Sequence, residues 1–254
     1  MTTTLARSRR WWPVAISLVA FLAAWKLVVL VGGYQPFILP APEVVAGRLV
    51  RAWAEGLMTP HAAATLTEIA LGFVAGASAG LAIGYLFARS PLAERFLSPY
   101  LVAAQATPIL ALAPLLALWF GTGLTSKVVI CSLIVFFPVA VATMVGIRSV
   151  DAGLLELGRS LRATRRQIVL KLEIPAALPS ILGGMRVGVT LAVVGAIVGE
   201  WAGAAQGLGV LVNIARGSLF DIPLMFATLV TIAAIGIGLY VLVVLVERRL
   251  VGVR

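Results

Sequence analysis

Long runs of apolar residues, separated by short polar segments, dominate the pattern of this chain. A helix needs about 20 mostly apolar residues to cross the roughly 30 Å hydrocarbon core of a bilayer. Each run that meets this length predicts a helix, because an open strand would leave backbone amides unpaired in lipid. Such runs cover residues 12–32, 67–88, 99–119, 127–147, 178–199 and 222–246. The pattern predicts an all-α polytopic membrane protein, with about six transmembrane helices in a single transmembrane domain over residues 1–254.

The connection over residues 33–64 is expected to hold a short amphipathic helix around residues 43–56. His61, the only histidine, is in this connection, and a lone surface histidine is expected to be inert. Thr65-Leu-Thr-Glu68 has the S/T-x-x-E spacing of a capping box, in which two side chains satisfy the first free amides of a helix. The second span is therefore predicted to begin at this point.

Two spans carry residues that predict special backbone contacts. The second span has glycines four residues apart, which share one helix face and permit close approach of another helix: Gly72, Gly76, Gly80 and Gly84. That face either packs within one subunit or forms a dimer contact. The third span contains Pro108 and Pro114, which predict kinks. Such a kinked helix either shapes packing or lines a pathway.

Composition agrees with a membrane protein, since 61% of the residues are hydrophobic and only 12% are charged. A net charge of +10 first suggests nucleic acid as a partner. The basic residues instead lie in short segments between apolar runs, as cytoplasmic loops do beside anionic lipid, so we expect no nucleic acid partner. The single cysteine, Cys131, excludes an internal disulfide. The basic N-terminus resembles a signal peptide, but its long apolar run predicts an uncleaved anchor.

The distribution of Lys and Arg predicts the orientation of the spans. With the N-terminus in the cytoplasm, 14 basic residues lie inside and four outside. This asymmetry predicts a multi-pass protein of the cell (inner) membrane with both termini cytoplasmic. Lys26 and Arg186 lie within spans and are expected to extend toward the interfaces.

The residue inventory argues against an enzyme. One histidine, one cysteine and scattered acids provide no catalytic cluster and no metal site. No phosphate-binding G-x-x-x-x-G-K-[ST] occurs, so the chain is not expected to hydrolyse ATP itself. A secondary transporter or channel with a basic membrane-surface loop stays as the alternative. Ionisable residues at the bilayer midplane would favour that alternative, but Glu68 and Glu200 lie at span ends.

The segment RSLRATRRQIVLKLEIP, residues 159–175, concentrates positive charge between the fourth and fifth spans. From Asp151 to Leu172 the sequence predicts a helix with Arg159, Arg162 and Arg166 on one face. Its apolar stripe would consist of Leu154, Leu157 and Leu161, and Pro175 and Pro179 would separate it from the next span. This pattern is typical of a basic amphipathic segment at the membrane surface.

The wider stretch ELGRSLRATRRQIVLKLEIP resembles the EAA loop of ATP-binding-cassette (ABC) importer permeases. Glu156 fills the Glu position, Leu157 and Gly158 the two Ala positions, and Leu172, Ile174 and Pro175 the closing I-x-L-P. Arg162 departs from the family by replacing its glycine. TPILALAPLLALWFGTG, VGEWAGAAQGLGVLV and the closing ERR resemble the nitrate, sulfonate and taurine class. SVDAGLLELGRSL and VTLAVVGAIVGEWAGA are most similar to permeases for thiamine-precursor pyrimidines (hydroxymethylpyrimidine) and riboflavin-type heterocycles.

The resemblance, which runs from about Pro36 to the C-terminus, implies a permease subunit that forms the translocation path for a small solute. It implies two partner ATP-binding subunits that hold ATP and Mg, a substrate-binding protein, and a second permease copy, as a homodimer. This chain would hold no cofactor. The coupling loop would span residues 148–177, with coupling residues Glu156, Gly158, Arg159, Leu161, Arg162, Ala163, Thr164 and Pro175. Candidate pathway or gate residues are Gln105, Thr107, Pro108, Pro114 and Glu200.

Overall fold

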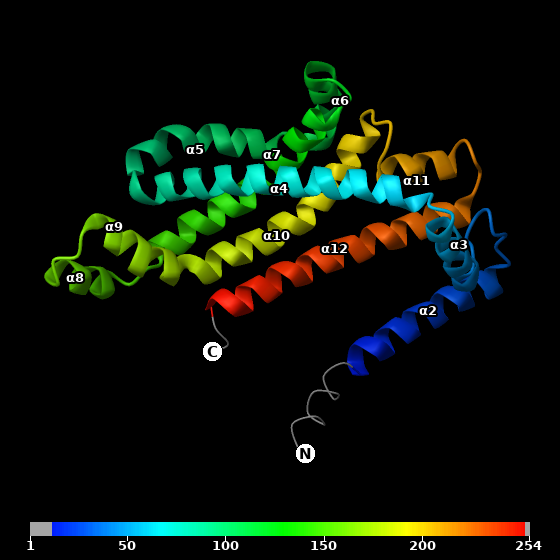
Figure 1. Ribbon diagram of the computed structural model, residues 1–254, viewed down its shortest axis with the longest axis horizontal. Coiled ribbons are helices and arrows are strands. Elements are labelled where there is room, and N and C mark those ends of the chain that lie inside the picture. Colours follow the sequence, from blue (N-terminus) through cyan, green and yellow to red (C-terminus); the bar gives the residue numbers. More distant parts are fainter. Residues whose placement is uncertain (1–11, 252–254) are drawn as a thin grey trace, which may run out of the picture. The chain divides into compact units, whose positions relative to one another are not determined.

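The computed structural model describes residues 12–251, and over that range every regular element is a helix (Figure 1). Arg7, Arg9, Arg10 and Arg254, which were used to predict the orientation, lie outside the described residues. The helices in the predicted spans are α2 (Trp12–Gly32), α4 (Met58–Arg89), α5 (Pro91–Ala106), α6 (Ile109–Phe120), α7 (Leu124–Arg148), α10 (Ile174–Trp201) and α12 (Ile222–Val251). The other elements are α3 (Pro42–Ala54), α8 (Ala152–Ser160), α9 (Arg165–Ile168), the π-helix η1 (Val169–Glu173) and α11 (Leu208–Arg216).

Five helical runs are long and apolar enough to cross a membrane, and the bent pair of α5 and α6 would provide a sixth. The five are α2, α4, α7, α12 and the continuous run Arg165–Trp201, which includes α10. They cover five of the six predicted ranges, because a run of apolar residues this long has its backbone hydrogen bonds satisfied only as a helix. The all-α architecture with about six membrane helices is confirmed.

The third predicted span is not one continuous helix over residues 99–119. α5 and α6 meet at an angle of 104°. The break falls at Thr107 and Pro108, whose backbones are extended, with ψ of 125° and 105°. A residue before proline is disfavoured in the helical region, so Pro108 ends α5 where a kink was expected. Pro114 lies inside α6.

The contacts divide the chain into two compact units, which are described separately. One comprises residues 1–59 and 211–230, and the other comprises residues 60–210 and 231–254.

The core of the second unit forms around α7, which packs against glycine faces on α4 and α10. On α4, a Cβ at Gly80 would lie 2.8 Å from the Phe136 carbonyl oxygen and 3.0 Å from Val139 Cβ. Gly72, Gly76 and Gly84 likewise face α7. This glycine face therefore packs within one subunit, which was one of the two predicted alternatives.

α10 presents a second glycine face to α7. A Cβ at Gly188 would meet Val135 and Val139, and one at Gly195 would meet Cys131. Gly184 and Gly199 approach the same helix. The sequence analysis missed this face because its glycines are spaced unevenly, whereas those of α4 recur every fourth residue. Close backbone approach on both sides leaves Cys131, Val135 and Val139 fully buried.

The first unit contains the amphipathic helix expected near residues 43–56, which forms as α3 and buries Val45 and Ala52. Lys26, which was predicted to extend toward the interface, donates from its Nζ to Glu43 Oε1 over 2.8 Å. This hydrogen bond holds the pKa of Glu43 below its ordinary value. The Trp25 and Phe226 rings, 5.7 Å apart, join α2 to the first part of α12.

The predicted start of the second span at Thr65 is wrong. α4 begins at Met58, so no capping box forms at Thr65, whose hydroxyl lies within hydrogen-bond distance of the His61 carbonyl (3.1 Å). His61 is partly buried rather than at the surface, and its Nδ1 lies 2.8 Å from the Gly207 carbonyl oxygen. Both errors arise because the helix extends beyond the apolar run that marks the span.

Candidate functional site

The basic connection between α7 and α10 consists of two short helices joined by a tight turn. Asp151 caps α8, because its Oδ1 accepts a hydrogen bond from the Leu154 amide over 2.8 Å. α8 ends at Ser160, so the single helix expected from Asp151 to Leu172 is not formed. The arginines therefore do not share one helix face, and Arg162 lies in the turn.

The turn after α8 is a Schellman motif, in which a left-handed residue reverses the chain. The Ala163 amide donates to the Gly158 carbonyl (3.0 Å), and the Arg162 amide donates to the Arg159 carbonyl (2.9 Å). Arg162 occupies the left-handed position with φ of 53°. Glycine is the usual residue there because it has no Cβ to clash. The family's glycine position thus coincides with the one residue of this loop that needs positive φ.

α9 begins with a complete capping box. The Thr164 hydroxyl accepts from the Gln167 amide, and the Gln167 side chain accepts from the Thr164 amide over 2.8 Å. The chain then continues through η1 into α10, with Pro175 in the first turn of α10. Pro175 and Pro179 were expected to separate two helices, but they do not. Pro175 lies where its missing amide is tolerated, and Pro179 lies inside α10.

Two contacts hold this loop in place, one between α8 and η1 and one between η1 and α4. Gly158 is buried, and a Cβ there would lie 2.7 Å from Leu172 Cδ1, so the missing side chain of Gly158 leaves the space that Leu172 of η1 occupies against α8. Glu173, which is 3% exposed, forms an ion pair with Arg89 at the end of α4. The sequence analysis missed this ion pair because its partners are far apart in the chain.

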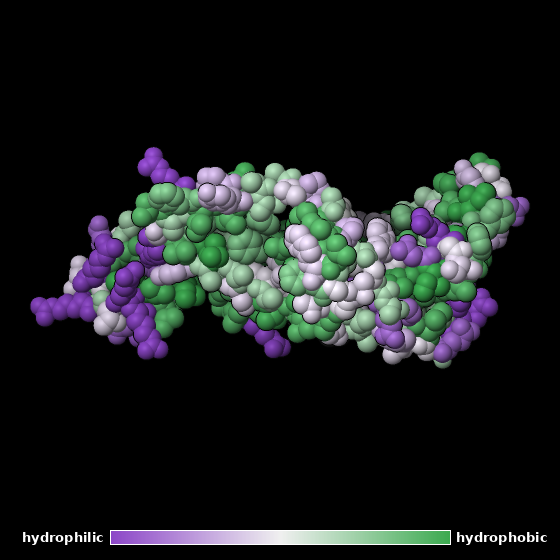
Figure 2. Space-filling model, turned by 90° about the horizontal axis from the view of Figure 1, so that it is seen from above, coloured by the Kyte–Doolittle hydropathy of each residue, from purple (hydrophilic) through white to green (hydrophobic). Residues whose placement is uncertain are grey.

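The outer face of α8 combines exposed apolar and charged side chains. Leu157 and Leu161 are 57% and 74% exposed. Glu156 and Arg159 are exposed on the same short helix. Figure 2 shows hydrophilic side chains projecting from the end of the second unit that carries α8 and α9. Exposed leucines among charges are what a helix offers when it lies in a groove of another protein.

The candidate pathway residues fall in two places. Gln105, Thr107 and Pro108 lie at the bend between α5 and α6, and Pro114 follows one turn into α6. Gln105 lines a small cavity of about 100 Å³ together with Phe87, Phe136 and Phe137. Glu200 lies elsewhere, in a buried polar cluster at the end of α10.

The Glu200 cluster satisfies the first amides of α11. The Glu200 carboxylate accepts a hydrogen bond from the Gly209 amide, and the Leu208 amide donates to Thr65 Oγ1 over 2.9 Å. The Thr65 hydroxyl in turn donates to Glu200 Oε1 over 2.5 Å. Gly207, with φ of 139°, leaves the space that Glu200 occupies. The G-L-G sequence therefore forms a cradle for a buried carboxylate.

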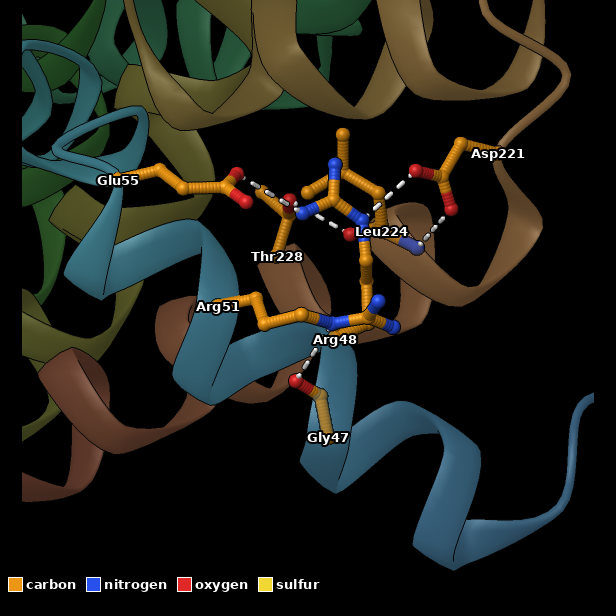
Figure 3. Close-up of polar contacts among 7 residues, drawn as sticks. All are labelled: Gly47, Arg48, Arg51, Glu55, Asp221, Leu224 and Thr228. Atoms are coloured by element: carbon orange, nitrogen blue, oxygen red, sulfur yellow. Dashed lines mark hydrogen bonds and ion pairs between the residues drawn. The ribbon is translucent and has the colours of Figure 1, made fainter.

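A second polar cluster, in the first unit, surrounds Arg48 (Figure 3). Arg48 Nε donates to Asp221 Oδ2 over 2.7 Å, and Glu55 lies 3.6 Å from its Nη1. The other Asp221 oxygen caps α12 by accepting from the Leu224 amide (2.9 Å). These residues line a cavity of about 310 Å³ together with Arg51. No pattern in the sequence links α3 to the start of α12, so this cluster was not predicted.

Residues 72–252 match the family described as the binding-protein-dependent transport system inner membrane component. The chain is 45% identical over 243 residues to the riboflavin transport system permease protein RibX of Chloroflexus aurantiacus, covering 94% of this chain and 90% of RibX. It is 35% identical to the formylaminopyrimidine transport permease protein ThiX of Halalkalibacterium halodurans, covering 80% of each. The taurine transport system permease protein TauC of Escherichia coli is 30% identical, with 96% and 94% coverage.

The fold is similar to that of solved transporters. A chain of the inward-facing MetNI methionine ABC transporter superposes with a TM-score of 0.62 at 23% identity, covering 80% of this chain and 94% of that one. The family match over residues 72–252 includes the loop between α7 and α10. The long apolar helices agree with the location in the inner membrane that the family description gives. The chain therefore belongs to the binding-protein-dependent transport system inner membrane components and is a permease subunit of an ABC importer.

Proposed function

We propose that this permease works as a homodimer, with two ATP-binding subunits docked on α8 and α9 and a substrate-binding protein that delivers the solute. The observation that carries the proposal is the exposed, leucine-bearing face of α8 on a rigidly fixed loop. In this arrangement Glu156, Arg159 and Leu161 contact the ATP-binding subunit directly. Arg162, Ala163 and Thr164 shape the turn that presents them.

The loop is built to transmit a displacement. Gly158 holds α8 against η1, and η1 continues into α10 without a break at Pro175. The Arg89–Glu173 ion pair joins the end of η1 to the end of α4. A movement imposed on α8 by closure of the ATP-binding subunits would therefore pass into two helices of the second unit. ATP and Mg bind the partner subunits in this proposal, and this chain holds no cofactor of its own.

The docking proposal is tested by Leu161→Asp and Glu156→Arg in the assembled transporter. In a docked groove Leu161→Asp would bury an unpaired carboxylate, which costs several kcal/mol, or at least tenfold in affinity. We expect the ATP-binding subunit to be lost on purification while the permease stays folded. Leu219→Asp is the matched control, because Leu219 is 54% exposed and lies in the connection before α12. Full assembly and transport with Leu161→Asp would refute the assignment.

For the solute, we propose a flat nitrogen heterocycle of the riboflavin or pyrimidine class. Support comes from the relatives named for riboflavin and formylaminopyrimidine, of which the first is 45% identical. Binding of riboflavin, hydroxymethylpyrimidine, taurine and an alkanesulfonate to the partner binding protein tests the class. Tight binding of taurine or the sulfonate alone would refute it.

Orientation with both termini cytoplasmic is part of the same proposal. It places the basic loop of α8 and α9 on the side of the ATP-binding subunits, and the distribution of Lys and Arg supports this orientation. Labelling of single cysteines by a membrane-impermeant reagent in intact cells tests it. We expect a cysteine at Arg159 to be protected and one at Leu219 to react.

A further inference from the structure

Three ionisable side chains are buried together in the second unit, and the transport mechanism proposed above uses none of them. Glu68 on α4, Lys127 on α7 and Glu200 on α10 are 5%, 1% and 2% exposed. The sequence pattern placed Glu68 and Glu200 at span ends. Burial makes the charge of each group costly unless it is compensated.

Lys127 does not form an ion pair with either carboxyl group. Among the described residues, no pair within 4.0 Å involves Lys127, Glu68 or Glu200. Its Nζ instead donates to the carbonyl oxygens of Thr122 and Gly203, the latter over 2.9 Å. These carbonyls solvate the ammonium group, while its charge still acts on both carboxyl groups across the cluster.

Glu200 has the surroundings of an ionised carboxylate. It accepts hydrogen bonds from the Thr65 hydroxyl and from the Gly209 amide. This amide is at the N-terminus of α11, where the helix dipole also favours negative charge. An ionised carboxylate can only accept hydrogen bonds, and both oxygens of Glu200 face hydrogen-bond donors.

Glu68 has the opposite surroundings. Its Oε2 is buried without a hydrogen-bond partner. The charge of the Glu200 carboxylate acts on Glu68 within the cluster. Two ionised carboxylates buried together repel each other, and neither has a proton to donate. A neutral Glu68 removes this repulsion and has a proton to donate, and its unpartnered oxygen then carries no charge.

We propose that Glu68 and Glu200 form a binding site for one proton, which resides on Glu68 and is donated to the Glu200 carboxylate. With this proton bound, one ammonium and one carboxylate remain, and the cluster is neutral overall. The other titratable groups that face it are His61 of α4, beside Gly207, and Cys131 of α7. The proton thereby keeps Glu200 in place against the G-L-G cradle and joins α4 to α11. This inference does not depend on the identity of the transported solute.

Infrared spectroscopy of the full-length permease in lipid nanodiscs tests the site directly. We expect a carboxylic-acid C=O stretching band at neutral pH that shifts in D2O and is lost in Glu68→Gln. The band should persist in Glu94→Gln, the matched control, because Glu94 pairs with Arg148 at 2.5 Å. Absence of the band in the wild type, or its survival in Glu68→Gln, would overturn the proposal. A sodium-dependent gain in thermal stability without the band would also overturn it, because the site would then bind a metal cation.

Stability measurements provide a second, independent readout. A carboxyl group that keeps its proton when folded and loses it when unfolded makes stability fall as pH rises. We expect this fall in the wild type and its loss in Glu68→Gln, which mimics the neutral acid. Glu200→Gln should lower the melting temperature at every pH, because Gln has one acceptor oxygen in place of the two that meet the Thr65 hydroxyl and the Gly209 amide. Equal losses from both Gln variants would refute the division into a neutral Glu68 and an ionised Glu200.

Discussion

Replacing Arg162 with glycine should stabilise the loop, although it removes a charge from the face proposed to dock. Arg162 is held at φ of 53° by the two hydrogen bonds of the Schellman turn. The left-handed conformation costs an L-residue about 1–2 kcal/mol, and glycine avoids this cost. Glycine also gives the unfolded chain more conformational freedom, which lowers the stability of the loop by about 0.4–1 kcal/mol. The relief of strain is larger, so a net gain in stability of about 1 kcal/mol is expected.

The charge and the backbone effect are separated by comparing Arg162→Gly with Arg162→Ala. Both variants remove the exposed guanidinium, but only glycine relieves the positive φ. Hydrogen–deuterium exchange of the Ala163 amide, which donates to Gly158, reports on the turn directly. A gain of about 1 kcal/mol corresponds to about fivefold slower exchange in Arg162→Gly than in Arg162→Ala.

The same two variants decide what the side chain contributes to docking. If the backbone shape matters most, Arg162→Gly should retain the ATP-binding subunit and transport at least as well as the wild type. If its charge matters most, both variants should lose the subunit equally. Exchange at Ala163 that is no slower in Arg162→Gly than in Arg162→Ala would refute the strain argument.

Further predictions follow from the packing and from the division of labour between subunits. Gly80→Ala should destabilise the permease by about 1–3 kcal/mol, because its Cβ would overlap the α7 backbone. Gly47→Ala, where no atom lies within 4 Å of the new Cβ, should instead stabilise α3 by about 1 kcal/mol; thermal unfolding of the two variants checks both signs, and equal shifts would contradict the argument. The purified permease should hydrolyse no ATP until its partner subunits are added, and hydrolysis by the contaminant-free chain would contradict its assignment as the passive subunit. Arg48→Met should lower the melting temperature, because it leaves the Asp221 carboxylate without its partner.

The sequence by itself determined which segments become membrane helices. Length and hydropathy are local properties, and a long apolar run has only one way to satisfy its backbone in lipid. The same local reasoning predicted the amphipathic α3 and singled out the basic loop. The loop's motif, including the glycine position at Arg162, was sufficient to indicate the family. It could not show that Arg162 itself adopts the left-handed conformation, because that depends on hydrogen bonds to Gly158 and Arg159.

Only the tertiary structure decided which polar groups lose their water. Thr65 and Glu68 have the spacing of a capping box, yet α4 begins seven residues before Thr65, and both side chains turn inward toward Glu200. Thr65 and Glu68, which the sequence places at the end of a span, therefore lie in a buried polar cluster. Burial depends on which helices pack against a residue, and α7 and α10 approach α4 closely enough to exclude water. Lys127 and Glu200, which share the cluster with Glu68, are more than 50 residues away from it in the chain, beyond the reach of any local pattern.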